Sequence, residues 1–145
     1  MALSFHPNPG AILACDYEPG FKEPEMVKRR PVVVITPRLR RRDSLCTVVP
    51  LSTLQPDHIQ DYHVKIKMTP LLPAPFDSEE CWAKADMLAT VGYHRLNPFR
   101  LGRDRYGKRL YYNSLMSPAN LRAIQRAVLC ALNLKHLTDH MTEPN

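Results

Sequence analysis

The chain has 145 residues, a size typical of one domain, and its 44% hydrophobic content is enough to fill an ordinary core. Its 20 lysines and arginines outnumber its 14 aspartates and glutamates, so the formal charge of +6 favours an acidic partner. No segment approaches the roughly 20 apolar residues of a membrane span, and the N-terminus lacks a secretory pattern, so we expect no membrane partner. We therefore expect a soluble, cytoplasmic protein.

The prolines at the start of the chain and the polar residues at its end bracket one predicted domain. Residues 1–9 form a Pro-rich lead-in, residues 10–135 a single barrel-type domain, and residues 136–145 a flexible tail. Within this tail, His136 and His140 are spaced i, i+4, which is more typical of an incidental pair than of a metal site.

The four cysteines are scattered in apolar neighbourhoods, with no C-x-x-C and no short Cys/His spacing of the kind that zinc needs. We expect no metal and no cofactor, and we interpret all four as reduced packing residues: Cys15, Cys46, Cys81 and Cys130.

The first half of the chain predicts three apolar strands. Residues 10–17 form the first, and a polar loop over residues 18–29 follows. Residues 32–35 are β-branched throughout and predict a buried strand, with Pro31 at its first position, where no ladder donor is needed. Residues 45–51 form the next strand and lead into Ser52 and Thr53.

The two central strands predict a specific contact. If they pair antiparallel through the loop at residues 37–44, the start of the first strand lies beside the end of the second. This pairing brings Arg30 close to Thr53. An arginine fork beside a hydroxyl suits a phosphodiester.

Two further strands are expected after residue 60. Residues 62–68 alternate, with Val64 and Ile66 facing inward, and the Pro-rich residues 68–78 form a loop. Residues 80–88 predict another strand. Its alternation puts Lys84 and Asp86 on the same face.

The remaining segments end in a helix. Residues 90–98 predict a turn or short helical piece, residues 101–109 a second basic loop, and residues 110–113 a last short strand. Ser117 as N-cap and Pro118 at the first helical position start the helix. Its apolar residues recur at helical spacing: Leu121, Ile124, Val128, Leu129 and Leu132.

Arginines gather on the loop between the central strands. Four of them, with one at the start of the preceding strand, are candidates for RNA binding: Arg29, Arg38, Arg40, Arg41 and Arg42. Exposed arginines on neighbouring loops can follow the backbone of a polyanion. The alternative is that this loop is a solvated hairpin tip.

The order of these motifs resembles the MazF/PemK (Kid) toxins of toxin-antitoxin systems. Glu25 followed five positions later by Arg30 and Pro31 is similar to the family's E-x-x-x-x-R-P signature. Thr53 falls where the family keeps a threonine. The run 84–86 (Lys-Ala-Asp) resembles the PemK-type R-C-D, although a lysine replaces the arginine and loses its bidentate fork.

The resemblance implies a mainly β fold with α structure, a small SH3-like barrel of the CcdB/Kid/MazF type with a C-terminal helix. It also implies a homodimeric, metal-independent endoribonuclease that cuts single-stranded RNA at short sequences. The implied partners are RNA and a cognate antitoxin with an acidic, partly disordered tail, with DNA bound only through the antitoxin complex. Met87, where the family has glutamine, is a further departure.

Metal-free RNA cleavage needs a base for the 2′-OH proton, a cation for the growing phosphoryl charge and an acid for the leaving oxygen. Glu25 or Asp86 could be the base, and Arg30 is placed to stabilise charge. Thr53 can donate to a nonbridging oxygen. Lys84 adds charge or acts as the acid. The expected products carry 2′,3′-cyclic phosphate and 5′-OH ends.

Two non-enzymatic functions on the same fold are alternative hypotheses. One is a CcdB-like inhibitor of a DNA-handling enzyme, and the other is a regulator that only binds its antitoxin and nucleic acid. Pure binding has no special need for the set of Glu25, Arg30, Thr53 and Asp86, so these residues favour the enzyme.

Overall fold

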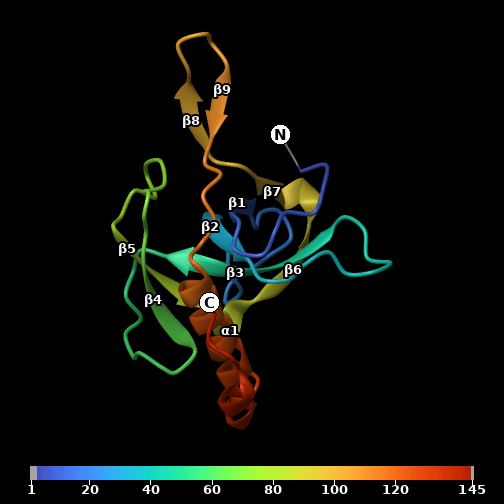
Figure 1. The fold of residues 1–145 in the computed structure, drawn as a ribbon, viewed down its shortest axis with the longest axis vertical. Helices are drawn as coiled ribbons and strands as arrows, with labels where there is room; N and C mark the ends of the chain where they lie inside the picture. Colours follow the sequence, from blue (N-terminus) through green and yellow to red (C-terminus); the bar gives the residue numbers. More distant parts are fainter. Residues whose placement is uncertain (1–2, 145) are drawn as a thin grey trace.

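The computed structural model describes residues 3–144 and consists mainly of antiparallel strands followed by one long helix (Figure 1). This confirms the predicted fold class. The strands are β1 (Ile12–Asp16), β2 (Arg29–Val34), β3 (Leu45–Ser52), β4 (His63–Lys67), β5 (Glu80–Lys84), β6 (Ala89–Gly92), β7 (Leu96–Asn97), β8 (Arg100–Arg103) and β9 (Arg109–Tyr111). The helices are α1 (Pro118–Ala131) and the 3₁₀ segments η1 (Ala85–Met87), η2 (Tyr93–Arg95) and η3 (Lys135–His140).

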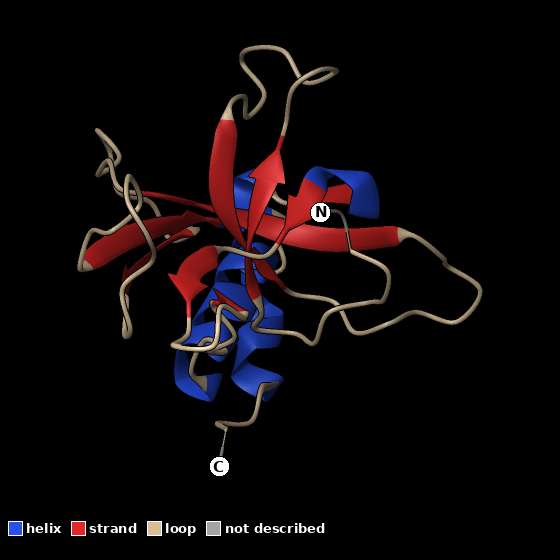
Figure 2. Cartoon of the chain, turned by 90° about the horizontal axis from the view of Figure 1, so that it is seen from above, coloured by secondary structure: helices blue, strands red, loops and turns tan. Residues whose placement is uncertain are grey.

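Strand β3 belongs to both halves of the main sheet. One of its edges pairs with β2 along residues 48–50. Its other edge pairs first with β6 along residues 45–48 and then with β5 at residues 51–52. The sheet therefore runs β4-β5-β3-β2-β1-β7, with β6 joined to β3. In Figure 2 the C-terminal helical segments lie together under these strands.

Two prolines mark where the pairing of β3 changes. The N–H of Ile35 donates to the oxygen of Thr47 at 3.1 Å. The backbone hydrogen-bonding groups of every second residue back from Ile35 along β2 therefore point toward β3. Pro31 is one of these and has no N–H, which fits the end of the ladder at Val32. The backbone nitrogen of Pro50 points toward the opposite edge of β3, between the residues that pair with β6 and those that pair with β5. The predicted antiparallel pairing of the two central strands is confirmed.

The core has two parts, one on each face of β2 and β3. Val33, Leu51 and Ile124 belong to the part that helix α1 covers. Val32 and Met26 belong to the part beneath the loop between β1 and β2. Because both faces are covered, the apolar run of β2 has no polar alternation, as expected for a strand buried on both sides.

Strand β1 closes the fold on the far side of β2. It pairs antiparallel with β2 and with β7. Just before it, Gly10 donates to Val34 at 2.8 Å and accepts from the N–H of Met116 at 2.9 Å. Ala11 forms an isolated bridge with Leu115. The segment before β1 is thus tied to the segment that leads into α1.

The expected strand over residues 80–88 is wrong in its second half. Strand β5 ends at Lys84, and the 3₁₀ turn η1 follows. The N–H of Ala85 donates to the oxygen of Tyr62 at 3.1 Å, and the chain then turns so that β6 reaches the first half of β3. Residues 90–98, expected as a turn or short helical piece, begin inside β6, contain the short helical segment η2 and end in β7.

The basic residues 101–109, expected as a loop, form most of the hairpin β8–β9. Its turn is closed by Asp104, whose carboxylate accepts from the N–H groups of Tyr106 at 2.8 Å and Lys108 at 2.9 Å. Gly107 has a φ of +81°, which only glycine adopts without strain. Figure 1 shows this hairpin projecting away from the rest of the molecule.

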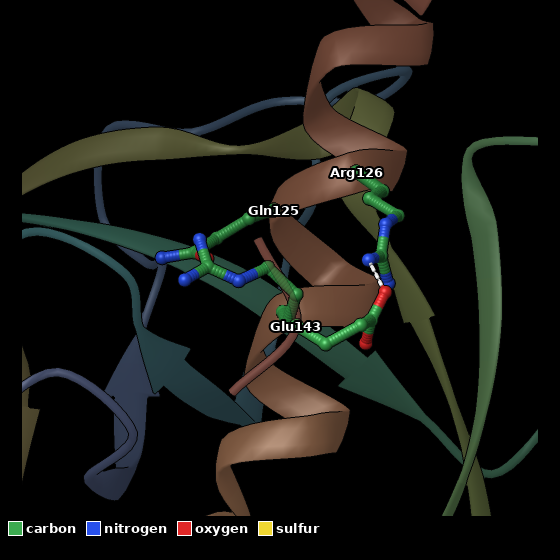
Figure 3. A network of polar contacts seen from close by, with 4 residues as sticks. Gln125, Arg126 and Glu143 are labelled. Atoms are coloured by element: carbon green, nitrogen blue, oxygen red, sulfur yellow. Dashed lines mark hydrogen bonds and ion pairs between the residues drawn. The ribbon is translucent and has the colours of Figure 1, made fainter. Parts of the chain in front are cut away.

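Helix α1 begins as predicted. Ser117 is its N-cap and accepts from the N–H of Asn120 at 3.2 Å. After α1, the segment expected to be flexible contains η3, and Glu143 pairs with Arg126 on the helix (Figure 3). Beside this pair, Gln125 accepts from Arg122 at 2.9 Å. Within residues 3–144, no helix is both long and apolar enough to cross a membrane.

All four cysteines are free thiols, as predicted. Cys15, Cys46 and Cys81 are buried, while Cys130 is half-buried on α1. Burial raises the pKa of the Cys15 thiol to about 12 and the pKa values of Cys46 and Cys81 to about 11. These three thiols therefore stay protonated at neutral pH.

Because the thiolate is the reactive form, we expect one fast-reacting thiol in the native protein. A thiol-reactive chromophore at neutral pH should titrate Cys130 quickly, and the other three cysteines only after denaturation. The variant Cys130→Ser should lose the fast phase. A second fast thiol in the folded protein would contradict this assignment.

Candidate functional site

An arginine missed by the sequence analysis fixes the loop that carries Glu25. Arg95, in η2, donates to the backbone oxygens of Asp16 at 3.0 Å, Tyr17 at 2.8 Å and Pro19 at 2.8 Å. A Cβ on Gly20 would lie 2.8 Å from the Arg95 guanidinium, and Gly20 also has a φ of +117°. No local pattern indicates this role, since the contacts of Arg95 are 76 to 79 residues away in sequence.

Three of the five predicted catalytic residues line one open hollow of about 530 Å³. They are Glu25 from the β1–β2 loop, Arg30 from β2 and Lys84 from the end of β5. The rest of the lining comes from the same loop and from η1: Glu23, Pro24, Met26, Val27 and Met87. The hollow thus brings two cations and two carboxylates together from segments far apart in the sequence.

Arg30 is held by the loop that it follows. Its Nε donates to the backbone oxygen of Val27 at 3.1 Å, and its side chain is half-buried. Among the described residues, no carboxylate pairs with it. Its terminal N–H groups therefore stay available for an anion. Glu25 is exposed, and one of its oxygens accepts from the N–H of Lys22 at 2.6 Å.

The other two predicted catalytic residues do not line this hollow. The β2–β3 register places Arg30 level with Ser52, because both lie two residues beyond the pair Val32 and Pro50. Ser52 is buried, and its Oγ accepts from the N–H of Leu54 at 3.2 Å. Thr53 is the next residue and is exposed.

Asp86 is exposed in η1. Its neighbour Met87 lines the hollow, whereas Asp86 does not. The break between β5 and η1 separates Asp86 from the regular alternation that the sequence predicted for it with Lys84.

The five arginines predicted to bind RNA differ in their surroundings. Arg29 lies 3.6 Å from Asp16 and over the ring of Phe99 at 5.8 Å. Arg38 lies 3.6 Å from Asp43, and this pair is exposed. Arg40 and Arg41 are exposed.

Arg42 instead turns toward the sheet. It donates to the hydroxyls of Thr36 at 3.3 Å and Thr47 at 3.5 Å. The structure thus gives Arg42 an intramolecular role at the base of the loop. The RNA-binding role of the five arginines stays a prediction.

The arrangement in the hollow suits the chemistry of a phosphodiester. A guanidinium and an ammonium can bind the phosphate oxygens and oppose the charge that grows on them during displacement. A nearby carboxylate with one free oxygen can accept a proton. The hollow is open, which allows a chain to cross it.

The comparisons with known proteins identify the family of this chain and agree with its fold. A family model described as PemK-like, MazF-like toxin of type II toxin-antitoxin system matches residues 8–129. The match spans most of the chain. The protein therefore belongs to the PemK-like, MazF-like toxin family, which confirms the resemblance found in its motifs.

Two relatives extend over nearly the full length of the chain. The chain is 33% identical to the uncharacterized protein YifN of Escherichia coli (strain K12), over 92% of this chain and 96% of the relative. It is 30% identical to an uncharacterized protein of Haemophilus influenzae, over 96% and 99%.

Solved toxin structures share the fold. The chain is similar to MazF from Deinococcus radiodurans with a TM-score of 0.58 and 15% identity, covering 90% of this chain and 99% of that one. It is also similar to an endoribonuclease from Mycobacterial species, solved in complex with its cognate antitoxin, with a TM-score of 0.56 and 21% identity. That similarity covers 89% of this chain and 97% of the mycobacterial one.

Proposed function

We propose that this toxin is a metal-independent endoribonuclease that cuts single-stranded RNA. The observation that carries the proposal is the shared hollow of Arg30, Lys84 and Glu25. Its cations supply the charge stabilisation that a displacement at phosphorus needs. The description of a similarly folded mycobacterial protein as an endoribonuclease supports this function.

In the proposed reaction, the 2′-OH attacks the neighbouring phosphorus and the bond to the 5′-oxygen breaks. Glu25 lines the hollow and is our first candidate for the base, while Asp86 in η1 is the second. Arg30 stabilises the phosphoryl charge, and Lys84 adds charge or protonates the leaving oxygen. Thr53 donates to a nonbridging oxygen from the end of β3.

The proposed partners follow from the same family. We propose that the toxin is inhibited by an antitoxin whose acidic, partly disordered tail covers the hollow, and that the active form is a homodimer. The mycobacterial neighbour, which was solved with its cognate antitoxin, supports the first of these. DNA would be bound only through the antitoxin complex.

Cleavage of a long unstructured RNA by the purified, antitoxin-free protein in excess chelator tests this function. We expect discrete cuts that leave 2′,3′-cyclic phosphate and 5′-OH ends. The same sequence with 2′-O-methyl groups at the cut positions should stay intact, because the attacking hydroxyl is missing. Intact unmodified RNA from a folded dimer would favour a non-catalytic, CcdB-like inhibitor or a binding regulator instead.

A further inference from the structure

We propose that the β8–β9 hairpin, residues 100–111, is an RNA-binding arm that holds single-stranded RNA outside the hollow. The proposal names a second contact for the substrate of the proposed function and rests on that function. It is carried by the charge of the hairpin, its exposed aromatic tip and its junction with the body of the protein.

The hairpin concentrates positive charge that the protein does not neutralise. It carries five cations, all exposed: Arg100, Arg103, Arg105, Lys108 and Arg109. Among the described residues, none of the five pairs with a carboxylate. The single acidic residue of the hairpin, Asp104, is occupied by the N–H groups of the turn. Such a strand pair has a strong attraction for a polyanion.

The tip presents a flat ring beside a guanidinium. Tyr106 is 79% exposed, and the guanidinium carbon of Arg105 lies 4.8 Å from the centre of its ring. A tyrosine this exposed lies outside the core, and the face of its ring can stack on an unpaired base. The turn beneath it is rigid, because Asp104 and the bond from Arg103 to the oxygen of Gly107 at 2.8 Å fix its backbone.

The base of the hairpin joins the predicted RNA path. Arg100 and Arg29 line the same hollow of about 340 Å³, together with Asp16, which is paired to Arg29. Arg29 precedes Arg30 in β2, and the N–H of Tyr112 anchors the hairpin by donating to the oxygen of Phe99 at 2.8 Å. Cations therefore continue from the proposed catalytic hollow, around the start of β2, to the arm.

The combination of features favours nucleic acid over an acidic peptide. An acidic peptide would use the cations but has no need of the exposed ring. A single-stranded RNA uses both, since its phosphates contact the cations and its unpaired bases stack. The two ligands can be separated because only RNA binding should depend on Tyr106.

Binding of a fluorescein-labelled, unstructured 2′-O-methyl oligoribonucleotide, followed by anisotropy over a series of salt concentrations, tests the arm. Tyr106→Ala should weaken binding roughly tenfold, the loss of one stacked base. Arg105→Gln/Lys108→Gln should lower the slope of log affinity against log salt by about 1.4, because each phosphate contact in a single strand contributes about 0.7. The control Lys65→Gln/Lys67→Gln removes the same charge from exposed positions of β4 and should keep the slope.

The outcomes separate the arm from the catalytic proposal, because the 2′-O-methyl probe cannot be cleaved by 2′-OH attack. Hairpin-dependent binding, with unmodified RNA left intact, would keep the arm and reject the endoribonuclease. Cleavage of RNA, with wild-type affinity and slope in both hairpin variants, would overturn the arm. An arm that binds polyglutamate as tightly as the probe, with no effect of Tyr106→Ala, would overturn the assignment to RNA and point to an acidic protein partner.

Discussion

Replacing Arg30 by alanine is expected to lower the rate of RNA cleavage by at least about 100-fold, the effect of removing one preorganised charge donor from a transition state. The guanidinium lines the proposed catalytic hollow and is held in place through its Nε, so its remaining donors are directed by the fold and not by the substrate. The measurement is a single-turnover cleavage rate in excess chelator.

Two variants sharpen this test. Arg30→Lys keeps the charge but loses the fork, so its rate should fall between those of the wild type and the alanine variant. Lys67→Ala removes an exposed cation from β4 and should cleave like the wild type. A folded Arg30→Ala protein that cuts RNA at the wild-type rate would remove Arg30 from the mechanism. Circular dichroism and thermal unfolding show whether the variant is folded.

Leu51→Ala is expected to lower the free energy of unfolding by about 3 kcal/mol, the middle of the range for a buried leucine. Leu51 is 2% exposed and lies where β3 passes from β2 to β5, opposite Ala83. Its side chain belongs to the part of the core that α1 covers, so alanine leaves a cavity between the sheet and the helix. Urea unfolding monitored by circular dichroism measures the change.

The matched control lies three positions further along the chain. Leu54 is 72% exposed, and its replacement by alanine should change the free energy of unfolding by no more than about 0.5 kcal/mol. Equal losses at both positions would show that the destabilisation does not come from the core.

The elements that the sequence predicted well are those specified by local chemistry. The β-branched run that ends at Ile35, with Pro31 at its start, allows little except a buried strand. Ser117 as N-cap and Pro118 at the first helical position define the start of the helix from neighbouring residues alone. In both places the backbone conformation and the burial pattern follow from neighbouring residues.

The elements that the sequence missed depend on distant contacts. The end of β5 is set by the bond of Ala85 to Tyr62 and by the pairing of β6 with β3, which no alternation near residue 85 reveals. Of the hairpin β8–β9, only the end was predicted, because the expected strand over residues 110–113 overlaps β9, while the exposed residues of β8 show no buried alternation.

The residues of the candidate site differ in the same way, because some could be predicted from the local sequence and others depend on distant contacts. Arg30 lies at the start of a predicted strand and Lys84 in the middle of another, and the family motif pointed to both; in the structure they line one hollow with Glu25. Thr53 follows the residue that is level with Arg30, and Asp86 lies on a turn that the sequence predicted as strand. Arg95 could not be found, since its contacts come only from the folded loop.

The junction between Gly10 and Met116 has a consequence for the synthesis of the protein. Leu115 and Met116 bond to the segment just before β1, so this junction can form only after they have left the ribosome. Pairing between residues so far apart is slow to form. We therefore expect this junction to close late in folding, after β1 has paired with β2 and β7.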